Sequence, residues 1–134
     1  MPNIEEHKKI INELVEDLNE KLREGVIVQR QKIIGFIVSE ASANLFAILL
    51  HKKNLIDPGY DVNHNFFVST KRANEAFSFD FPKKAKVIGL LTEVEDYRNK
   101  LCYGKDKSPE IVKEAIRKFF ELKEFIEKEI GEDI

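Results

Sequence analysis

The sequence predicts an all-α protein, a compact bundle of about five helices in which one buried central helix is surrounded by the others. Four long segments carry apolar residues at spacings of three and four, the period of a helix with a buried face. Residues that cap or stop helices separate these segments. The β-branched run at residues 25–28 has no second run with which it could pair in a sheet, so we expect it to lead into a helix.

Size and composition indicate one domain, residues 1–134, with an N-terminal helix at 3–24 and a core at 29–130. Hydrophobic residues make up 43% of the chain and include ten phenylalanines, enough for a sizeable core. The single cysteine, Cys102, excludes a disulfide framework. The net charge of −2 argues against a protein that coats nucleic acid, and the abundance of Lys and Glu is typical of a hyperthermophile.

Two helices are expected in the first half of the chain. Asn3 is the expected N-cap of the first helix, and Gly25 is the residue expected to end it. The second helix is expected from about Gln29 to Lys53. Its residues are apolar nearly all round, which predicts the buried central position.

Turn and cap residues divide the second half into one short and two long helices. Turn residues at 54–59 end the central helix. A short helix is expected at 69–79, and Pro82 is expected in the first turn of a long helix that Gly104 ends. The last helix is expected between the cap and stop residues of segment 108–131.

The longest apolar stretch, residues 33–50, is interrupted by Ser39, Glu40, Ser42 and Asn44. We therefore expect it to be too polar and too short to span a membrane. Residues 1–6 are acidic and lack the apolar run of a signal peptide. A cytoplasmic protein without a membrane partner is expected.

Polar side chains are concentrated in the last turns of the helix that Gly104 ends. Arg98 offers a planar fork of donors that suits phosphate, and Asn99 can orient a phosphate or a water molecule. Tyr103 is expected close to Arg98. The alternative is structural, with Arg98 paired to a neighbouring carboxylate, Glu95 or Asp96, and the tyrosine covering the core.

Residues 98–103, Arg-Asn-Lys-Leu-Cys-Tyr, resemble the signature of the HEPN domains, a helical superfamily that contains many RNA-cutting enzymes. The order of helices is also similar over about residues 33–130. The resemblance implies that Arg98 and Asn99 act on RNA, and that Tyr103 stands where the family has a histidine. Tyrosine, with a reference pKa near ~10, is a poor base at neutral pH. The resemblance therefore implies a chain that binds RNA or a partner without cutting RNA.

A second resemblance competes with the first. The chain is similar to a small archaeal family grouped by shape with the ribonuclease III catalytic domain, in which one buried helix is surrounded by others. In that domain a glycine–aspartate pair on such a helix helps to hold Mg²⁺. Here Ser39 and Glu40 stand in its place, and the family's full motif is absent. This resemblance implies a metal-dependent endoribonuclease.

Glu40 is also unusual in its own right, because a carboxylate on an apolar helix is costly to bury unless it is paired or bound to metal. Glu93, Glu95 and Asp96 supply further oxygen ligands of the kind that suit Mg²⁺ or Mn²⁺. Two such ions would suit phosphodiester hydrolysis. The alternative is an ion pair between Glu40 and an arginine: Arg98, Arg30 or Arg72.

The loop after the central helix offers two further features. His64 is the best candidate for a substitute base, since no pair of the three histidines has the spacing of metal ligands. Five phenylalanines follow within residues 66–81. They are expected either to stack on bases or to cover the core or a dimer interface.

Two functions remain open from the sequence. The first is an RNA-directed helical domain of ribonuclease-like lineage, either an endoribonuclease or a relative that binds RNA after losing catalysis. The alternative is a non-enzymatic module that forms a homodimer, or that docks a partner such as the nucleotidyltransferase of a toxin–antitoxin pair. The near-heptad stripe of the first helix favours self-association. In this alternative Arg98 and Glu95 are structural.

Overall fold

The computed structural model describes residues 3–134 and confirms the all-α prediction. The described chain contains no strand. It forms five α-helices and one short 3₁₀ helix, which are α1 (Ile4–Glu24), α2 (Gln31–Lys52), η1 (His64–Phe67), α3 (Thr70–Ala76), α4 (Lys84–Cys102) and α5 (Pro109–Ile130).

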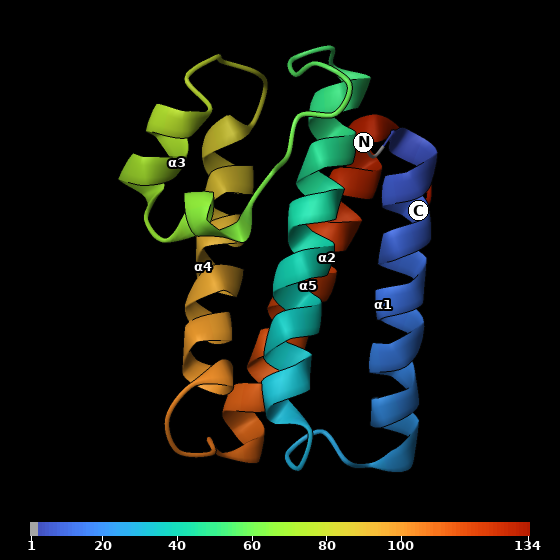
Figure 1. Ribbon diagram of the computed structural model, residues 1–134, viewed down its shortest axis with the longest axis vertical. Helices are drawn as coiled ribbons and strands as arrows, with labels where there is room; N and C mark the ends of the chain where they lie inside the picture. The colour runs from blue at the N-terminus through green and yellow to red at the C-terminus, as the bar shows by residue number, and fades with distance from the viewer. Residues whose placement is uncertain (1–2) are drawn as a thin grey trace.

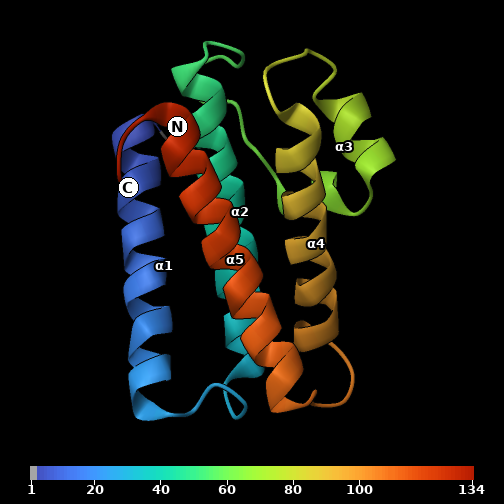
Figure 2. The ribbon, with the colours of Figure 1, turned by 180° about the vertical axis from the view of Figure 1, so that it is seen from behind.

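The α2 helix occupies the centre of the bundle, as its composition predicts. It packs against α1, α4 and α5. In Figure 1 the helices α1, α2 and α4 stand side by side, and Figure 2, the view from behind, shows α5 crossing in front of α2. Most side chains of α2 are buried, among them Ile34, Leu45 and Phe46, while Ile33 and Phe36 in its first half remain exposed. The α3 helix lies on the outer side of α4, and η1 packs against both α4 and α2 (Figure 1).

The structure corrects one expectation about α2. With 22 residues it is long and apolar enough to cross a membrane by length and composition alone, although the sequence suggested otherwise. In the bundle, 78% of its most apolar window is buried by the other helices. Such burial is typical of the central helix of a helical core.

Cap residues begin and end the helices where the sequence predicts. The Asn3 side chain accepts a hydrogen bond of 2.9 Å from the backbone N–H of Glu6. Gly25 ends α1 and Gly131 ends α5, both in the left-handed conformation that glycine adopts without a steric cost. Pro109 occupies the first turn of α5.

The segment between α3 and α4 differs from the prediction. The short helix ends at Ala76 rather than at Phe79, because Phe77 leaves the helix to enter the core. Pro82 lies in a turn, and α4 begins two residues later at Lys84. The Lys84 ammonium group donates to the backbone carbonyls of Phe77 and Phe79, which no helix satisfies.

Phenylalanine rings pack this segment against the central helix. The Phe77 ring meets the Phe46 ring of α2 edge-on, with centroids 5.0 Å apart, and stacks on Phe67 of η1. Phe67, Phe77 and Phe81 are buried. These three rings therefore cover the core, and the surface presents none of them for stacking on bases.

Candidate functional site

Glu95 is the centre of a polar network between α2, η1 and α4. It lies on the face of α4 that turns toward α2 and is only 3% exposed. One carboxylate oxygen accepts a hydrogen bond of 3.1 Å from Ser39 Oγ, and the other lies 2.9 Å from His64 Nδ1. A buried carboxylate requires such partners. Glu95 therefore ties the 3₁₀ helix to both long helices.

His64 is oriented by this contact. Because a carboxylate oxygen accepts, Nδ1 of the imidazole is the donor and Nε2 is the other ring position. Nε2 makes no hydrogen bond to any residue of segment 3–134, and 22% of the side chain is exposed. An imidazole held by a carboxylate, with its second nitrogen free, is the arrangement of a general base.

Arg98 lies one turn beyond Glu95 on the same face of α4. Its Nη1 donates to Ser39 Oγ over 3.2 Å and lies 3.7 Å from Glu40 Oε1. The guanidinium carbon is 5.6 Å from the centre of the Phe36 ring. The Glu40 ion pair with Arg98, rather than with Arg30 or Arg72, is thus the one that forms.

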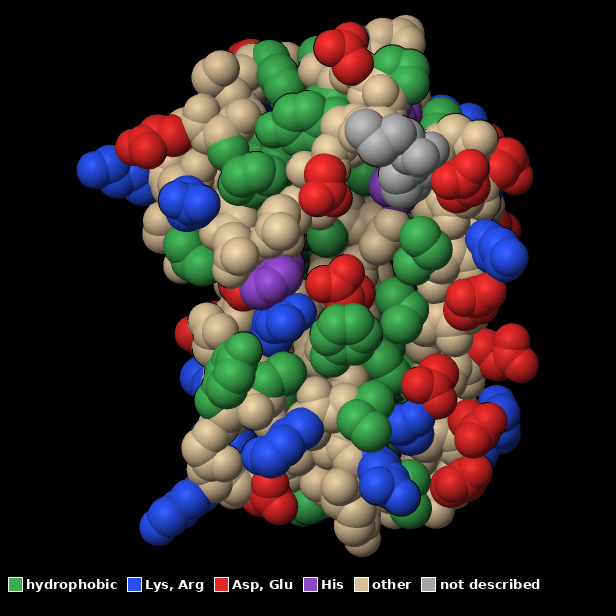
Figure 3. Space-filling model, in the orientation of Figure 1, with side chains coloured by type: hydrophobic (Ala, Val, Ile, Leu, Met, Phe, Trp, Pro, Cys, Tyr) green, Lys and Arg blue, Asp and Glu red, His purple; other side chains and the backbone are tan. Residues whose placement is uncertain are grey.

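The network reaches the surface on the face seen in Figure 1. Figure 3 shows a histidine side chain between acidic and basic side chains near the middle of this face, with hydrophobic side chains next to them. Ile33 and Phe36 are close to half exposed, and both belong to α2. Ser39 bridges Glu95 and Arg98 beneath this surface. The site combines a cation, an imidazole and exposed apolar surface.

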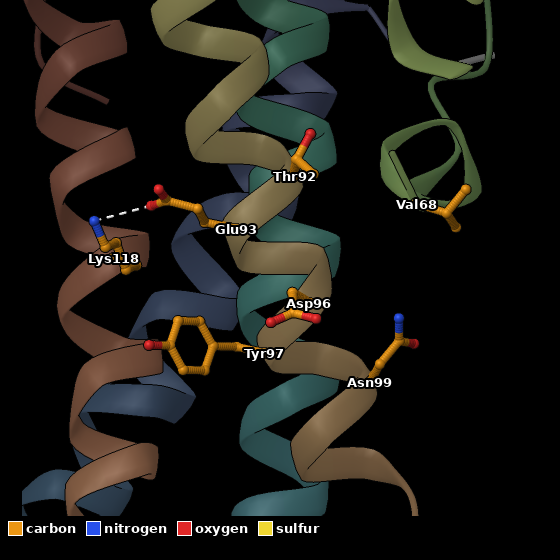
Figure 4. Close-up of a pocket in the computed structure, with 7 residues that line it drawn as sticks. All are labelled: Val68, Thr92, Glu93, Asp96, Tyr97, Asn99 and Lys118. Carbon is orange, nitrogen blue, oxygen red and sulfur yellow. Dashed lines mark ion pairs between the residues drawn. The ribbon is translucent and has the colours of Figure 1, made fainter. Parts of the chain in front are cut away.

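Asn99 does not join Arg98. A helix turns by about 100° per residue, so Asn99 faces outward while Arg98 faces α2. Asn99 lines a separate cleft of about 430 Å³ on the outer side of α4, together with Asp96 and Val68. In Figure 4 these three side chains border the same opening.

The four carboxylates expected at a metal site are dispersed. Glu40 pairs with Arg98 and Glu95 is buried in the network. Glu93 pairs with Lys118 at 2.9 Å, and Asp96 pairs with Lys100 at 3.1 Å; Figure 4 marks the Glu93 pair. Within residues 3–134 no group of three or more His, Cys, Asp or Glu side chains is placed to hold a metal ion. The oxygens do not converge as Mg²⁺ or Mn²⁺ requires.

Tyr103 follows the last residue of α4 and is 62% exposed. It lies close to the first turn of α2, because Cys102 Sγ donates to the Lys32 carbonyl and Lys32 Nζ donates to the Gly104 carbonyl. The tyrosine therefore does not cover the core. It is a third exposed apolar side chain near the start of α2, besides Ile33 and Phe36.

Sequence reasoning identified Arg98 and Glu40 and weighed His64 as a base. It did not identify the bond between His64 and Glu95, or the bridging role of Ser39. A serine in the most apolar helix of the chain was the one signal of a buried polar contact. The histidine and its carboxylate are 31 positions apart in the sequence, and no spacing rule predicts the path of the chain between them.

Comparisons with protein-family models, curated proteins and solved structures give no significant match to this chain. The two family resemblances therefore rest on the residues quoted for them.

Proposed function

We propose that this chain is an RNA-directed helical domain that binds RNA where α2, η1 and α4 meet, and that His64 supports cleavage there. One observation carries the proposal. Ser39 and Glu95 hold an arginine and a histidine side by side, with the histidine's Nε2 left unbonded by residues 3–134. A stability network alone does not require an imidazole with a free nitrogen.

Arg98 is suited to bind a phosphate. Its partner Glu40 is about one-third exposed and stands 3.7 Å away, so a phosphate can share or displace that contact. Phe36 already packs against the guanidinium and offers a ring on which a base can stack. Lys32, at the end of the same face, adds positive charge.

His64 provides the chemistry. Its Nε2 would take the proton from the 2′-hydroxyl of a bound ribose as that oxygen forms a bond to phosphorus. The bond from phosphorus to the 5′-oxygen breaks, and the leaving oxygen takes up a proton. The products are a 2′,3′-cyclic phosphate and a 5′-hydroxyl. Arg98 would balance the negative charge that develops on the phosphorus oxygens.

The binding claim is tested by fluorescence anisotropy with single-stranded RNA at low salt. We expect Arg98→Ala to lower the affinity by about tenfold or more, since charge-assisted hydrogen bonds contribute roughly 1.5–3 kcal/mol. Arg117→Ala is the matched control, because Arg117 lies exposed on α5 and pairs only with carboxylates of its own helix. Absence of binding, or equal affinities for both variants, would contradict the proposal.

The cleavage claim is tested with the same RNA in the presence of EDTA. We expect slow cleavage by the wild-type chain and a loss of about 10²-fold or more for His64→Gln, the typical range for a general base. RNA affinity should remain close to that of the wild type. If both proteins bind RNA and neither cleaves it, the chain is an RNA-binding domain and the proposed role of His64 as a base is wrong.

A second candidate is the dimerising module, favoured by the exposed apolar side chains Ile33, Phe36 and Tyr103. Contiguous exposed apolar surface often marks a protein interface. Sedimentation equilibrium should then show a dimer that Phe36→Asp dissociates. A wild-type chain that stays monomeric at high concentration would exclude this candidate.

A further inference from the structure

Two histidines face each other between α1 and α2, away from the site described above. His7 of α1 is only 5% exposed, and its ring centre lies 5.7 Å from that of His51 of α2. We propose that this imidazole pair is a pH-sensitive attachment, which holds α1 on α2 while both rings are neutral and releases α1 when they take up protons in mild acid. The inference does not rest on the proposed action on RNA, because it uses none of the residues of that site.

The surroundings of both rings favour the neutral form. His7 Nδ1 lies 2.7 Å from Asn44 Oδ1, and Asn44 Nδ2 donates to the Glu40 carbonyl over 2.8 Å, so the amide oxygen faces the ring and Nδ1 is the donor. A second proton must therefore bind at Nε2. Nε2 of His7 and Nε2 of His51 are both buried, and neither has a hydrogen-bond partner within residues 3–134. An imidazolium ion at either position would bury an N–H group without an acceptor.

The charged side chains next to the pair do not compensate an added proton. Lys8 follows His7 in the sequence and Lys52 follows His51, and Glu132 pairs with both lysines. Glu5 lines the cleft beside His51 and lies 3.8 Å from Lys8. Within residues 3–134 neither ring has a carboxylate at ion-pair distance.

The other elements packed against α2 also direct their carboxylates to partners of their own. On α5, Glu127 pairs with Lys123. Glu129 of α5 pairs with Lys83, the residue before α4. The η1 helix contributes His64, whose partner is Glu95 of α4. The imidazole pair therefore has no acidic neighbour that would stabilise its charged form.

The pH range of the change follows from the pKa of His51. Burial is the main cause that lowers this pKa below its ordinary value of 6.5, and the facing His7 lowers it further. His51 stands in the last turn of α2, where the helix dipole favours a cation, so the effect of burial exceeds that of the dipole. The unfolded chain therefore binds the proton more readily than the folded chain. The stability of the attachment is complete above pH 6.5 and is lost as the pH falls from 6.5 through the folded value.

The α1 helix is the element that can respond to this change. Among the elements of the described chain it packs against α2 alone, whereas α2 also packs against α4 and α5. Its buried residues are His7, Ile11 and Leu18, so His7 is the one polar side chain in the row that holds it. Protonation charges this row near the end at which α1 begins. Opening then exposes the imidazoles to water and uncovers the side of α2 that α1 covers.

The test is amide hydrogen exchange of the full wild-type chain, followed by NMR between pH 7.5 and pH 5. This range stays above pH 4.5, below which the ion pairs of Glu132 are lost. After correction for the intrinsic exchange rate, we expect the protection of α1 amides to fall below pH 6.5, by up to about tenfold per pH unit for each proton taken up on opening. Amides of α4 should keep their protection. His51→Gln should make the decrease in α1 smaller, and His64→Gln is the matched control that should retain it, because η1 does not pack against α1.

Protection of α1 that does not change with pH, or that falls equally in α1 and α4, would overturn the proposal. So would a His51→Gln variant with the full pH dependence of the wild type. A second measurement does not depend on whether that variant folds. In the wild-type chain the NMR signals of the His51 ring should shift to the protonated form only over the pH range in which α1 loses protection. Protonation of His51 while α1 stays protected would also contradict the proposal.

Discussion

Ser39 of α2 donates a hydrogen bond to Glu95 and accepts one from Arg98 across the interface of α2 and α4. Each bond satisfies a polar group that the apolar surroundings would otherwise leave without a partner. The same bonds hold the His64 ring and the Arg98 guanidinium in position. Glu95 therefore stabilises the packing of the two helices and orients His64 through the same carboxylate.

Removing the Glu95 carboxylate should lower the free energy of unfolding. Glu95→Ala leaves Ser39 and His64 without their acceptor, and an unsatisfied buried polar group costs about 1–3 kcal/mol. Urea denaturation measures this change in the free energy of unfolding. Glu93→Ala is the control, since its exposed pair with Lys118 should contribute only about 0–1 kcal/mol. Equal losses in both variants would show that the buried network adds no stability.

Cys102 should react slowly with alkylating reagents. Burial raises the pKa of its thiol, and the nearby Arg98 and Lys32 lower it only in part. The reactive thiolate is therefore scarce at neutral pH. Mass spectrometry should show slower reaction with iodoacetamide at pH 8 than for the chain unfolded in urea, and slower still for Arg98→Ala. Equal rates in the folded and unfolded chains would contradict this account.

The α2 and α4 helices approach closely where α2 carries Gly35. A β-carbon at this position would lie 2.8 Å from Cys102 Sγ and 3.0 Å from Leu101 Cβ. The absence of a side chain therefore permits the close contact that brings Ser39 to Glu95. At Gly89 of α4 a β-carbon would have no neighbouring atom within 4 Å, so this position does not require glycine.

These two glycines allow a matched test. Gly35→Ala should destabilise the protein by about 1–3 kcal/mol, as overpacking in a core does. Gly89→Ala should stabilise it by about 0.5–1 kcal/mol, because alanine restricts the unfolded chain and favours the helix. Thermal denaturation of both variants gives the comparison. A neutral effect of Gly35→Ala would mean that the helices can move apart without cost.

Helix boundaries were predictable where a local signal decides them. Asn3, Gly25 and Gly131 act through their own backbone or side-chain bonds, so the sequence is sufficient. The end of α3 was not predictable, because Phe77 leaves the helix to join rings from α2 and η1. Tertiary packing there outweighs local helix propensity.

The candidate site was only partly predictable for the same reason. Arg98 was identified because a charged residue stood among positions that should face the core. Asn99, its neighbour in sequence, lies on a different face of α4 and lines another cleft. The partner of His64 is 31 residues away. A short motif shows which residue types are present, while the path of the loop and the rotation of the helix decide which of them meet.

The start of α1 and the end of α5 lie close together at one end of the bundle (Figure 1). Glu132 pairs with Lys8 of α1 and Lys52 of α2, and the hydrogen bond from Lys8 is the main cause that lowers the Glu132 pKa. A carboxyl group whose pKa is lower in the folded state stabilises the protein above its unfolded pKa of 4.5. That contribution is lost as the pH falls below 4.5 through the folded value.

Glu132→Gln should therefore be less stable than the wild type at pH 7 and equally stable at pH 3. Urea denaturation at the two pH values makes the comparison. High salt should reduce the difference at pH 7, because these charged groups are partly exposed to solvent. A difference that persists at pH 3 would assign the effect to packing rather than to charge.

The central claim concerns the whole molecule, because the proposed RNA site exists only where α2, η1 and α4 meet. An NMR titration with short single-stranded RNA tests it most directly. The account predicts that the ring signals of His64 and the guanidinium signals of Arg98 shift together, while those of Arg117 and His7 do not. RNA that leaves His64 and Arg98 unshifted, or that shifts only residues elsewhere, would contradict it.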